Sequence, residues 1–274
     1  MGSLRDSILA ASKLDGHVSH IQTTESMIIE QHLNKLFYVQ PNYDLEIKML
    51  QMQAKQKSSD RYGLHASSML ESDNKFCYRE QVLSLFYEQM QGEQVNQSLK
   101  RIFEEGNFIG EKWQRLFIRG GLGKPEDMDC SRFVKKYDLS YTPDAIITIN
   151  KKRYIVEIKS QNTFQFKKQS GHPTGEKQCL FYQHLEGIHN GFALVEDKND
   201  QTFKVLMVKY EEEFLGKQIE RLENIQVYKK RLIQEKKMVK GICPDVNCKR
   251  ASECSMKDAC FNVGKGRIKL CIQK

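Results

Sequence analysis

The sequence predicts an α/β fold in which a small mixed sheet, built around two strand hairpins, is flanked by helices and followed by a cysteine-stapled subdomain. Three observations predict it. Two pairs of segments rich in β-branched and aromatic residues are each separated by a short polar turn. Segments with apolar residues at helical spacing precede and follow them. Four cysteines lie close together near the C-terminus: Cys243, Cys248, Cys254 and Cys260.

Composition narrows the class of protein. The chain has 274 residues, 39% of them hydrophobic, which is enough for a sizeable core. It has no apolar run of about 18 residues, and its first residues lack the layout of a signal peptide. We therefore expect a soluble, cytoplasmic protein with no membrane partner. The net charge of +8 suits a partner with a phosphate backbone.

The chain divides into three expected parts. Residues 1–62 form a helical N-terminal arm, residues 63–240 the core, and residues 241–274 a cysteine-cluster subdomain with a basic tail. In the arm, Pro41 separates two helical segments, and the second extends from Tyr43 to Lys57. At the start of the core, Asp73 is expected to cap a helix that continues through Phe86 to Gln91.

The core alternates strands and helices. One hairpin is predicted over 143–149 and 153–160, and a second over 191–197 and 202–210. The polar segment 161–175 between the hairpins is expected to be a loop, in which phenylalanines and lysines either stack on bases or pack on the core. Helices are predicted at 176–186 and, as a long amphipathic stripe, from Leu215 to Leu232.

The first hairpin contains the charged residues that indicate chemistry. A side-chain period of two places Glu157 and Lys159 on one face of the second strand, and the preceding strand begins next to Asp144. Charges in an apolar strand are costly unless they pair or bind a metal. Two carboxylates suit Mg²⁺, and a lysine can orient the attacking water. This set of groups predicts hydrolysis of a phosphodiester.

These residues resemble the signature of the PD-(D/E)XK nuclease superfamily: Pro143-Asp144, twelve residues, then Glu157-Ile158-Lys159. On the following helix, Gln178-x-x-x-Tyr182 is similar to the motif of the RecB-type exonuclease branch. The resemblance implies a restriction-endonuclease-like fold with Asp144 and Glu157 as ligands of Mg²⁺ or Mn²⁺. It further implies that Lys159 activates water and that Gln178 and Tyr182 hold the substrate.

One motif departs from the family pattern. The segment from Gly106 to Gln114 resembles the family's first motif, in which a histidine or glutamate adds a metal ligand, but that position is occupied by Gly110. Glycine has no side chain that could bind a metal. Three alternatives follow: the neighbouring Glu111 takes the role, a water occupies the coordination position, or the protein is impaired.

The cysteine cluster indicates a second metal centre. Thiolates select zinc or iron–sulfur clusters, and the segment is too poor in apolar residues to fold well alone. Its spacing resembles the iron–sulfur element of the RecB-type group typified by AddB. Cys77-Tyr-Arg79 is similar to the upstream cysteine element of CRISPR-associated nucleases. Either Cys77 joins Cys248, Cys254 and Cys260, or the four C-terminal cysteines bind the metal without it. Cys130, Cys179 and Cys271 are expected to be ordinary thiols.

The resemblance implies a metal-dependent DNA exonuclease acting on single strands or on DNA ends. Roles in recombination, replication or phage DNA processing follow from the same likeness, with a recombination or replication protein as a further partner in a prokaryotic or phage-infected cell. Two alternatives stay open: a site-specific endonuclease on the same fold, and a non-catalytic DNA-binding adaptor. The glycine at position 110 makes the adaptor credible.

Overall fold

A computed structural model describes residues 23–57, 63–87 and 97–261. Its helices occur in two groups along the chain. The first group is α2 (Thr24–Leu36), α3 (Tyr43–Lys57), α4 (Tyr78–Ser84) and α5 (Gln97–Arg119). The second is α6 (Thr163–Lys168), α7 (Pro173–Glu186), α8 (Glu212–Glu235), α9 (Lys249–Ser252) and α10 (Lys257–Phe261). Within the described ranges, no helix combines the length and apolar character needed to cross a membrane.

Two mixed sheets lie between these helices, and the larger contains both predicted hairpins. Its strands lie in the order β4 (Ala145–Ile149), β5 (Lys152–Gln161), β6 (Gly191–Asp197) and β7 (Phe203–Met207). The hairpins β4–β5 and β6–β7 are antiparallel, and the central pair β5–β6 is parallel. The first hairpin turns through Asn150 and Lys151, both at positive φ, as tight two-residue turns require.

The smaller sheet was not predicted. It contains β1 (Leu64–His65), β2 (Arg132–Val134) and β3 (Leu139–Tyr141) in the order β1-β3-β2. β1 pairs with β3 in parallel although more than seventy residues separate them along the chain. Such pairing depends on tertiary contacts, and strands of two or three residues leave almost no periodicity in the sequence.

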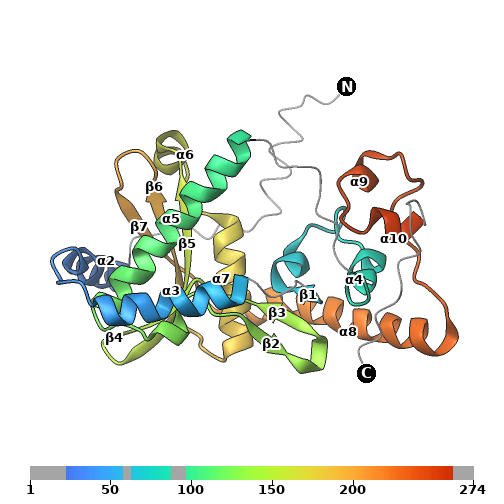
Figure 1. Cartoon of the computed structure of the whole chain (residues 1–274), viewed down its shortest axis with the longest axis horizontal. Coiled ribbons are helices and arrows are strands. Elements are labelled where there is room, and N and C mark those ends of the chain that lie inside the picture. The colour runs from blue at the N-terminus through green and yellow to red at the C-terminus, as the bar shows by residue number, and fades with distance from the viewer. Residues whose placement is uncertain (1–22, 58–62, 88–96, 262–274) are drawn as a thin grey trace.

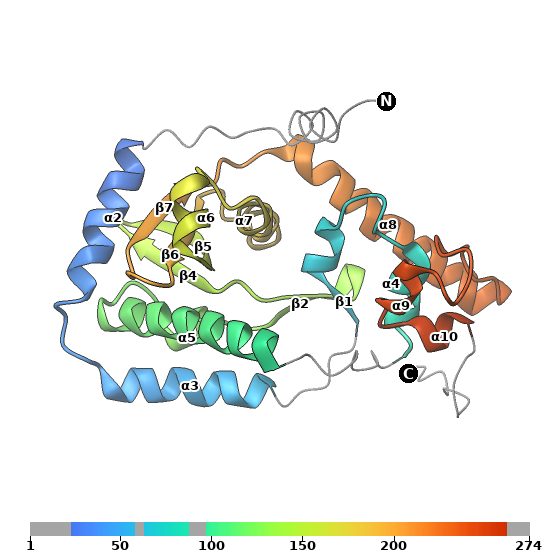
Figure 2. The same ribbon diagram turned by 90° about the horizontal axis from the view of Figure 1, so that it is seen from above.

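The larger sheet has a hydrophobic core on each face. On one face, Trp113 and Phe117 of α5 belong to a buried cluster with Val156 and Ile158 of β5. On the other face, α7 covers β5 and β6, and its residues join a separate cluster with Ile155. Figure 2 shows α5 and α7 on opposite sides of the strands. Burial on both faces explains the apolar runs Tyr154–Val156 of β5 and Phe192–Val195 of β6.

Beyond the sheet, α8 extends toward α4, α9 and α10, which lie together at the end of the molecule where the described chain finishes (Figure 1). The bounds of α3 agree with the prediction, and α8 contains the predicted amphipathic stripe. The segment 161–175 is not wholly a loop, because α6 forms within it. Its Phe166 packs against the core, whereas Phe164 is 71% exposed.

The predicted capping role of Asp73 is wrong. α4 begins at Tyr78 after Cys77 and ends at Ser84, before Phe86. Residues 88–91 of the predicted helix lie outside the described residues. Asp73 instead forms ion pairs with Lys217, at 2.5 Å, and with Arg221, at 2.9 Å.

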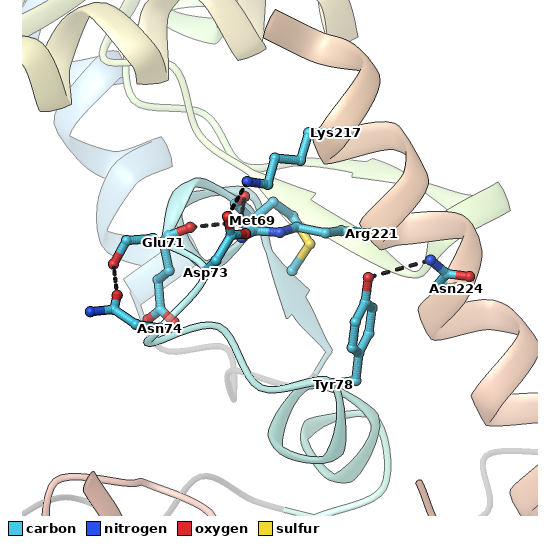
Figure 3. Close-up of polar contacts among 9 residues, drawn as sticks. Met69, Glu71, Asp73, Asn74, Tyr78, Lys217, Arg221 and Asn224 are labelled. Atoms are coloured by element: carbon cyan, nitrogen blue, oxygen red, sulfur yellow. Dashed lines mark hydrogen bonds and ion pairs between the residues drawn. The ribbon is translucent and has the colours of Figure 1, made fainter. Parts of the chain in front are cut away.

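Arg221 joins α8 to the segment that precedes α4, as Figure 3 shows. Its guanidinium donates to the carbonyl oxygens of Met69, at 2.6 Å, and Glu71, at 2.7 Å. It also lies 4.0 Å from the ring centroid of Phe76. Because Arg221 is 4% exposed, these contacts satisfy a buried charge rather than a surface one.

Candidate active site

The face of β5 that α7 covers carries the predicted catalytic residues. The pairing of Ala145 with Val156 sets a register that, extended by one residue, places Asp144 opposite Glu157. Glu157 is 2% exposed, and the side chains of Lys159 and Asp144 are about one quarter exposed. The structure thus brings together the three residues that the sequence predicted would meet.

Short polar contacts hold these groups. The ammonium of Lys159 lies 2.5 Å from Glu157 Oε1 and 3.9 Å from Asp144 Oδ2. Asp144 Oδ2 accepts a hydrogen bond of 2.7 Å from the backbone N–H of Ile158. Behind the site, Gln114 of α5 donates to the carbonyl oxygen of Asp144 at 2.9 Å. Gln114 in turn accepts a hydrogen bond of 2.9 Å from Gln53 of α3.

Burial and neighbouring charges shift the pKa values of Glu157 and Lys159. Burial and, after it, the negative charge of Asp144 raise the pKa of Glu157 to about 8. Burial acts to lower the pKa of Lys159, but the charges of Glu157 and Asp144 outweigh it and raise this pKa above its ordinary value. Near neutral pH the site therefore contains an ammonium and a readily protonated Glu157.

The donor set fits a hard divalent cation. Glu157 Oε2 is buried and has no hydrogen-bond partner among the described residues, so it is a free ligand atom beside Asp144. Mg²⁺ needs only one or two protein carboxylates and takes its remaining ligands from water and substrate phosphate. No group of three or more His, Cys, Asp or Glu in the described ranges could by itself hold a metal ion. The site therefore offers two carboxylates rather than a complete set of protein ligands.

Gln178 and Tyr182 lie on successive turns of α7. Tyr182 is 5% exposed, and its ring centroid is 5.8 Å from that of Tyr141. Burial and the charges of Glu157 and Asp144 raise the pKa of Tyr182. Its hydroxyl therefore interacts electrostatically with both carboxylates. Gln178 is partly exposed. Its role toward the substrate stays a prediction.

The structure does not bring Glu111 to this site by any described contact. Glu111 forms an ion pair of 2.5 Å with Arg115, one turn further along α5. Gly110 lies between Gly106, which faces Ser160, and Gln114, which contacts Asp144. Because residues four apart share a helical face, Gly110 also faces the sheet. A Cβ atom at Gly110 would meet nothing within 4 Å.

This open space allows a prediction. Gly110→His is expected to leave DNA cleavage equal to that of the wild type or higher, because the side chain has room and a non-glycine residue favours the helix. Initial cleavage rates in Mg²⁺ check it. Gly216→His is a matched control, since α8 is also open at that position. A sharp loss of cleavage in Gly110→His alone would show that the motif is misplaced.

Three residues outside the predicted catalytic set also support the site. Gln114 holds the backbone of Asp144, and its spacing of four from Gly110 was the available signal. His172 and Gly175, at the start of α7, lie against Lys159. No local pattern marks them, because their contact with β5 exists only in the folded chain.

Four of the cysteines lie together at the end of the molecule that contains α4, α9 and α10. One pocket is lined by four thiols, those of Cys77, Cys243, Cys254 and Cys260. Cys77, from the segment before α4, therefore does lie beside the C-terminal cysteines. The four thiols line the pocket without forming a group that could hold a metal as they stand in the described structure.

Two of the C-terminal cysteines form hydrogen bonds through their sulfur atoms. Cys248 Sγ accepts a hydrogen bond of 3.3 Å from the N–H of Ala251 and so caps α9. Cys254 donates to Glu80 Oε1 at 3.2 Å, and Glu80 is ion-paired with Arg250. Burial raises the pKa of Cys243 to about 11, and burial with the charge of Glu80 raises that of Cys254 to about 12. Both are thiols near neutral pH.

Comparisons with known proteins give weak structural likenesses, one of them to an alkaline exonuclease. No family model and no curated protein matches the sequence. The structure of SSO0001 is similar at a TM-score of 0.40 and 13% identity, covering 81% of this chain and 98% of that one. The alkaline exonuclease of Laribacter hongkongensis is similar at a TM-score of 0.41 and 14% identity, covering 64% of this chain and 93% of that one. In complex with dAMP, that exonuclease gives a TM-score of 0.42 and 14% identity, covering 63% and 90%.

Proposed function

We propose that this chain is a metal-dependent deoxyribonuclease that hydrolyses phosphodiester bonds, acting as an exonuclease on single strands or DNA ends. The observation that carries the proposal is the meeting of Asp144, Glu157 and Lys159 on one face of β5, with a carboxylate oxygen of Glu157 left without a partner in the described structure. Recombination, replication or phage DNA processing would supply such substrates.

Each residue has a distinct task in this proposal. Asp144 and Glu157 would hold Mg²⁺ or Mn²⁺, which when bound stabilises negative charge on the phosphate and favours ionised water. The Lys159 ammonium orients the water for attack, and its raised pKa keeps it charged. The Ile158 N–H fixes Asp144, and Gln178 and Tyr182 border the same face, where they would contact the substrate. Glu111 is retained as a candidate third ligand that would have to leave Arg115.

End-labelled linear DNA and circular DNA, both single- and double-stranded, test this function in Mg²⁺ or Mn²⁺. Wild type should degrade linear DNA only, and Asp144→Ala should not. Asp44→Ala is the matched control, because Asp44 is an exposed aspartate on α3. Cleavage of circular DNA would identify an endonuclease. DNA binding without any cleavage would favour the adaptor, which the absence of a ligand side chain at Gly110 supports.

We further propose that the cysteine pocket binds an iron–sulfur cluster, with zinc as the alternative. Sulfur ligands suit both metals. The pocket favours Cys77, Cys243, Cys254 and Cys260 as the ligand set, with Cys243 rather than Cys248 as the fourth ligand. Because Cys243 and Cys254 are protonated in the metal-free protein, metal binding must release protons and strengthen as pH rises.

Metal content separates the two cysteine sets. Cys243→Ser is expected to lose most of the bound iron or zinc of anaerobically purified protein, whereas Cys248→Ser should retain it, because Cys248 already caps α9 and serine is a good cap residue. Elemental analysis and the visible absorption spectrum check this. Retention of metal by Cys243→Ser together with its loss from Cys248→Ser would refute the assignment.

A further inference from the structure

The first turn of α7 is packed directly on the side chain of Lys159. A Cβ atom at Gly175 would lie 2.9 Å from Lys159 Cγ and 3.3 Å from its Cε. The first distance is shorter than real Cβ contacts. Any side chain at position 175 would therefore displace the lysine stem or the helix. Glycine allows the backbone of α7 to touch the methylene groups of the candidate catalytic lysine.

His172 fixes that turn. Its Nδ1 accepts a hydrogen bond of 3.1 Å from the N–H of Gly175, and its own backbone N–H donates to Glu176 Oε1 at 2.6 Å. These two bonds form a reciprocal cap at the start of the helix. Burial and the positive charge of Lys159 lower the pKa of His172. The imidazole is thus neutral near pH 7, as an accepting Nδ1 requires.

A lysine side chain does not adopt a single conformation unless neighbouring groups restrict it. Its side chain is a flexible four-carbon stem that ends in a freely rotating ammonium. Here that ammonium must lie 2.5 Å from Glu157 and within 3.9 Å of Asp144. On the side of α7, the backbone of Gly175 lies against the stem, and the His172 ring holds that backbone through the Gly175 N–H.

We propose that His172 and Gly175 are positioning residues, which set the place of the Lys159 ammonium by folding the first turn of α7 against its stem. Neither residue has to touch the reacting phosphate. The task of the ammonium in cleavage rests on the nuclease function proposed above, whereas the confinement of Lys159 does not. A displacement of about 1 Å at a catalytic group can reduce a rate about 100-fold, so small shifts of this turn have large consequences.

Two measurements distinguish the positioning role of His172 and Gly175 from the proposed nuclease function. The first is the rate at which acetic anhydride acetylates Lys159, followed by mass spectrometry, which needs no enzymatic activity. The second is kcat and KM for DNA cleavage. The variants are His172→Ala, His172→Asn and Gly175→Ala. Thr23→Ala is the control, because it removes the side-chain cap of α2 without contacting Lys159.

His172→Ala and Gly175→Ala are expected to change acetylation of Lys159 at least about threefold and to lower kcat about tenfold or more, with KM within about twofold. His172→Asn should restore both values, since asparagine also accepts the capping hydrogen bond. Thr23→Ala should leave both at the wild-type level. Unchanged acetylation of Lys159 in folded His172→Ala and Gly175→Ala would overturn the positioning role. Changed acetylation in a protein without cleavage activity would uphold it and refute the nuclease instead.

Discussion

Replacing Lys159 by methionine is expected to lower the rate of DNA cleavage about a thousandfold or more and to leave DNA binding nearly unchanged. Methionine keeps an apolar stem that can lie under Gly175, but it removes the only charge that contacts both Glu157 and Asp144 in the described structure. A positioned acid–base or electrostatic group contributes about 10²–10⁴ to a rate. Binding is expected to depend on the net positive charge of the chain and on the metal, which the variant largely retains.

Single-turnover cleavage in Mg²⁺ and fluorescence anisotropy in Ca²⁺ measure the two quantities separately. Lys35→Met is the matched control, because Lys35 is exposed in the last turn of α2. Cleavage by Lys159→Met at close to the wild-type rate would remove this lysine from the mechanism. Loss of binding together with cleavage would assign it to substrate affinity instead.

The central hairpin was predictable because its signals are local. Turn residues at Asn150 and Lys151, together with a period of two along β5, suffice to place Glu157 and Lys159 on one face. That face was confirmed. The prediction of its chemistry needed only the identity of the residues, because charged groups in an apolar strand require partners wherever the strand lies.

Long-range contacts account for what the sequence did not reveal. The parallel pairing of β5 with β6 and the smaller sheet depend on contacts between distant segments. Asp73 has the residue type and position of a helix cap, but Lys217 and Arg221, about 150 residues away, compete for its carboxylate. Two charged partners provide stronger hydrogen bonds than the backbone N–H groups of a short helix.

The candidate site likewise combines features that the sequence indicates with features that only the structure shows. The sequence marks Gly110 as a departure from the motif that its segment resembles, and only the structure shows the space beside it. Spacing alone favoured Cys248 over Cys243, whereas Cys243 lines the pocket that Cys77, Cys254 and Cys260 share. A motif indicates the residue types of a site, whereas the fold decides which of those side chains lie together.

A second large effect is expected for Glu157→Gln, which should abolish cleavage and at the same time stabilise the metal-free protein at alkaline pH. The pKa of Glu157 is about 8 in the folded chain, raised by burial and by Asp144 from an ordinary 4.5. The folded state therefore binds this proton more tightly than the unfolded state. The stability that the proton contributes is fully present below about pH 4.5 and is lost as pH rises through 8.

Glutamine reproduces the protonated carboxyl at every pH. Its oxygen can still accept from Lys159, as Glu157 Oε1 does, and its amide carries no charge beside Asp144. A shift from 4.5 to about 8 corresponds to about 5 kcal/mol, reached once Glu157 is ionised in both the folded and the unfolded state. In a chain of this length that is a rise in Tm of about 10 °C or more. The difference in Tm between the variant and the wild type should therefore grow from pH 5 to pH 9.

Thermal unfolding in EDTA across this pH range checks the prediction, and Glu46→Gln provides a control of opposite sign. A hydrogen bond from Arg119 lowers the pKa of Glu46, so its ionised form stabilises the fold above its ordinary pKa, and its removal should destabilise the protein from pH 5 to 9. Adding Mg²⁺ should raise the Tm of the wild type at pH 9 but not that of Glu157→Gln, because the metal binds the ionised carboxylate in place of the proton. A Tm difference that stays constant with pH would mean that Glu157 is already ionised in the folded protein.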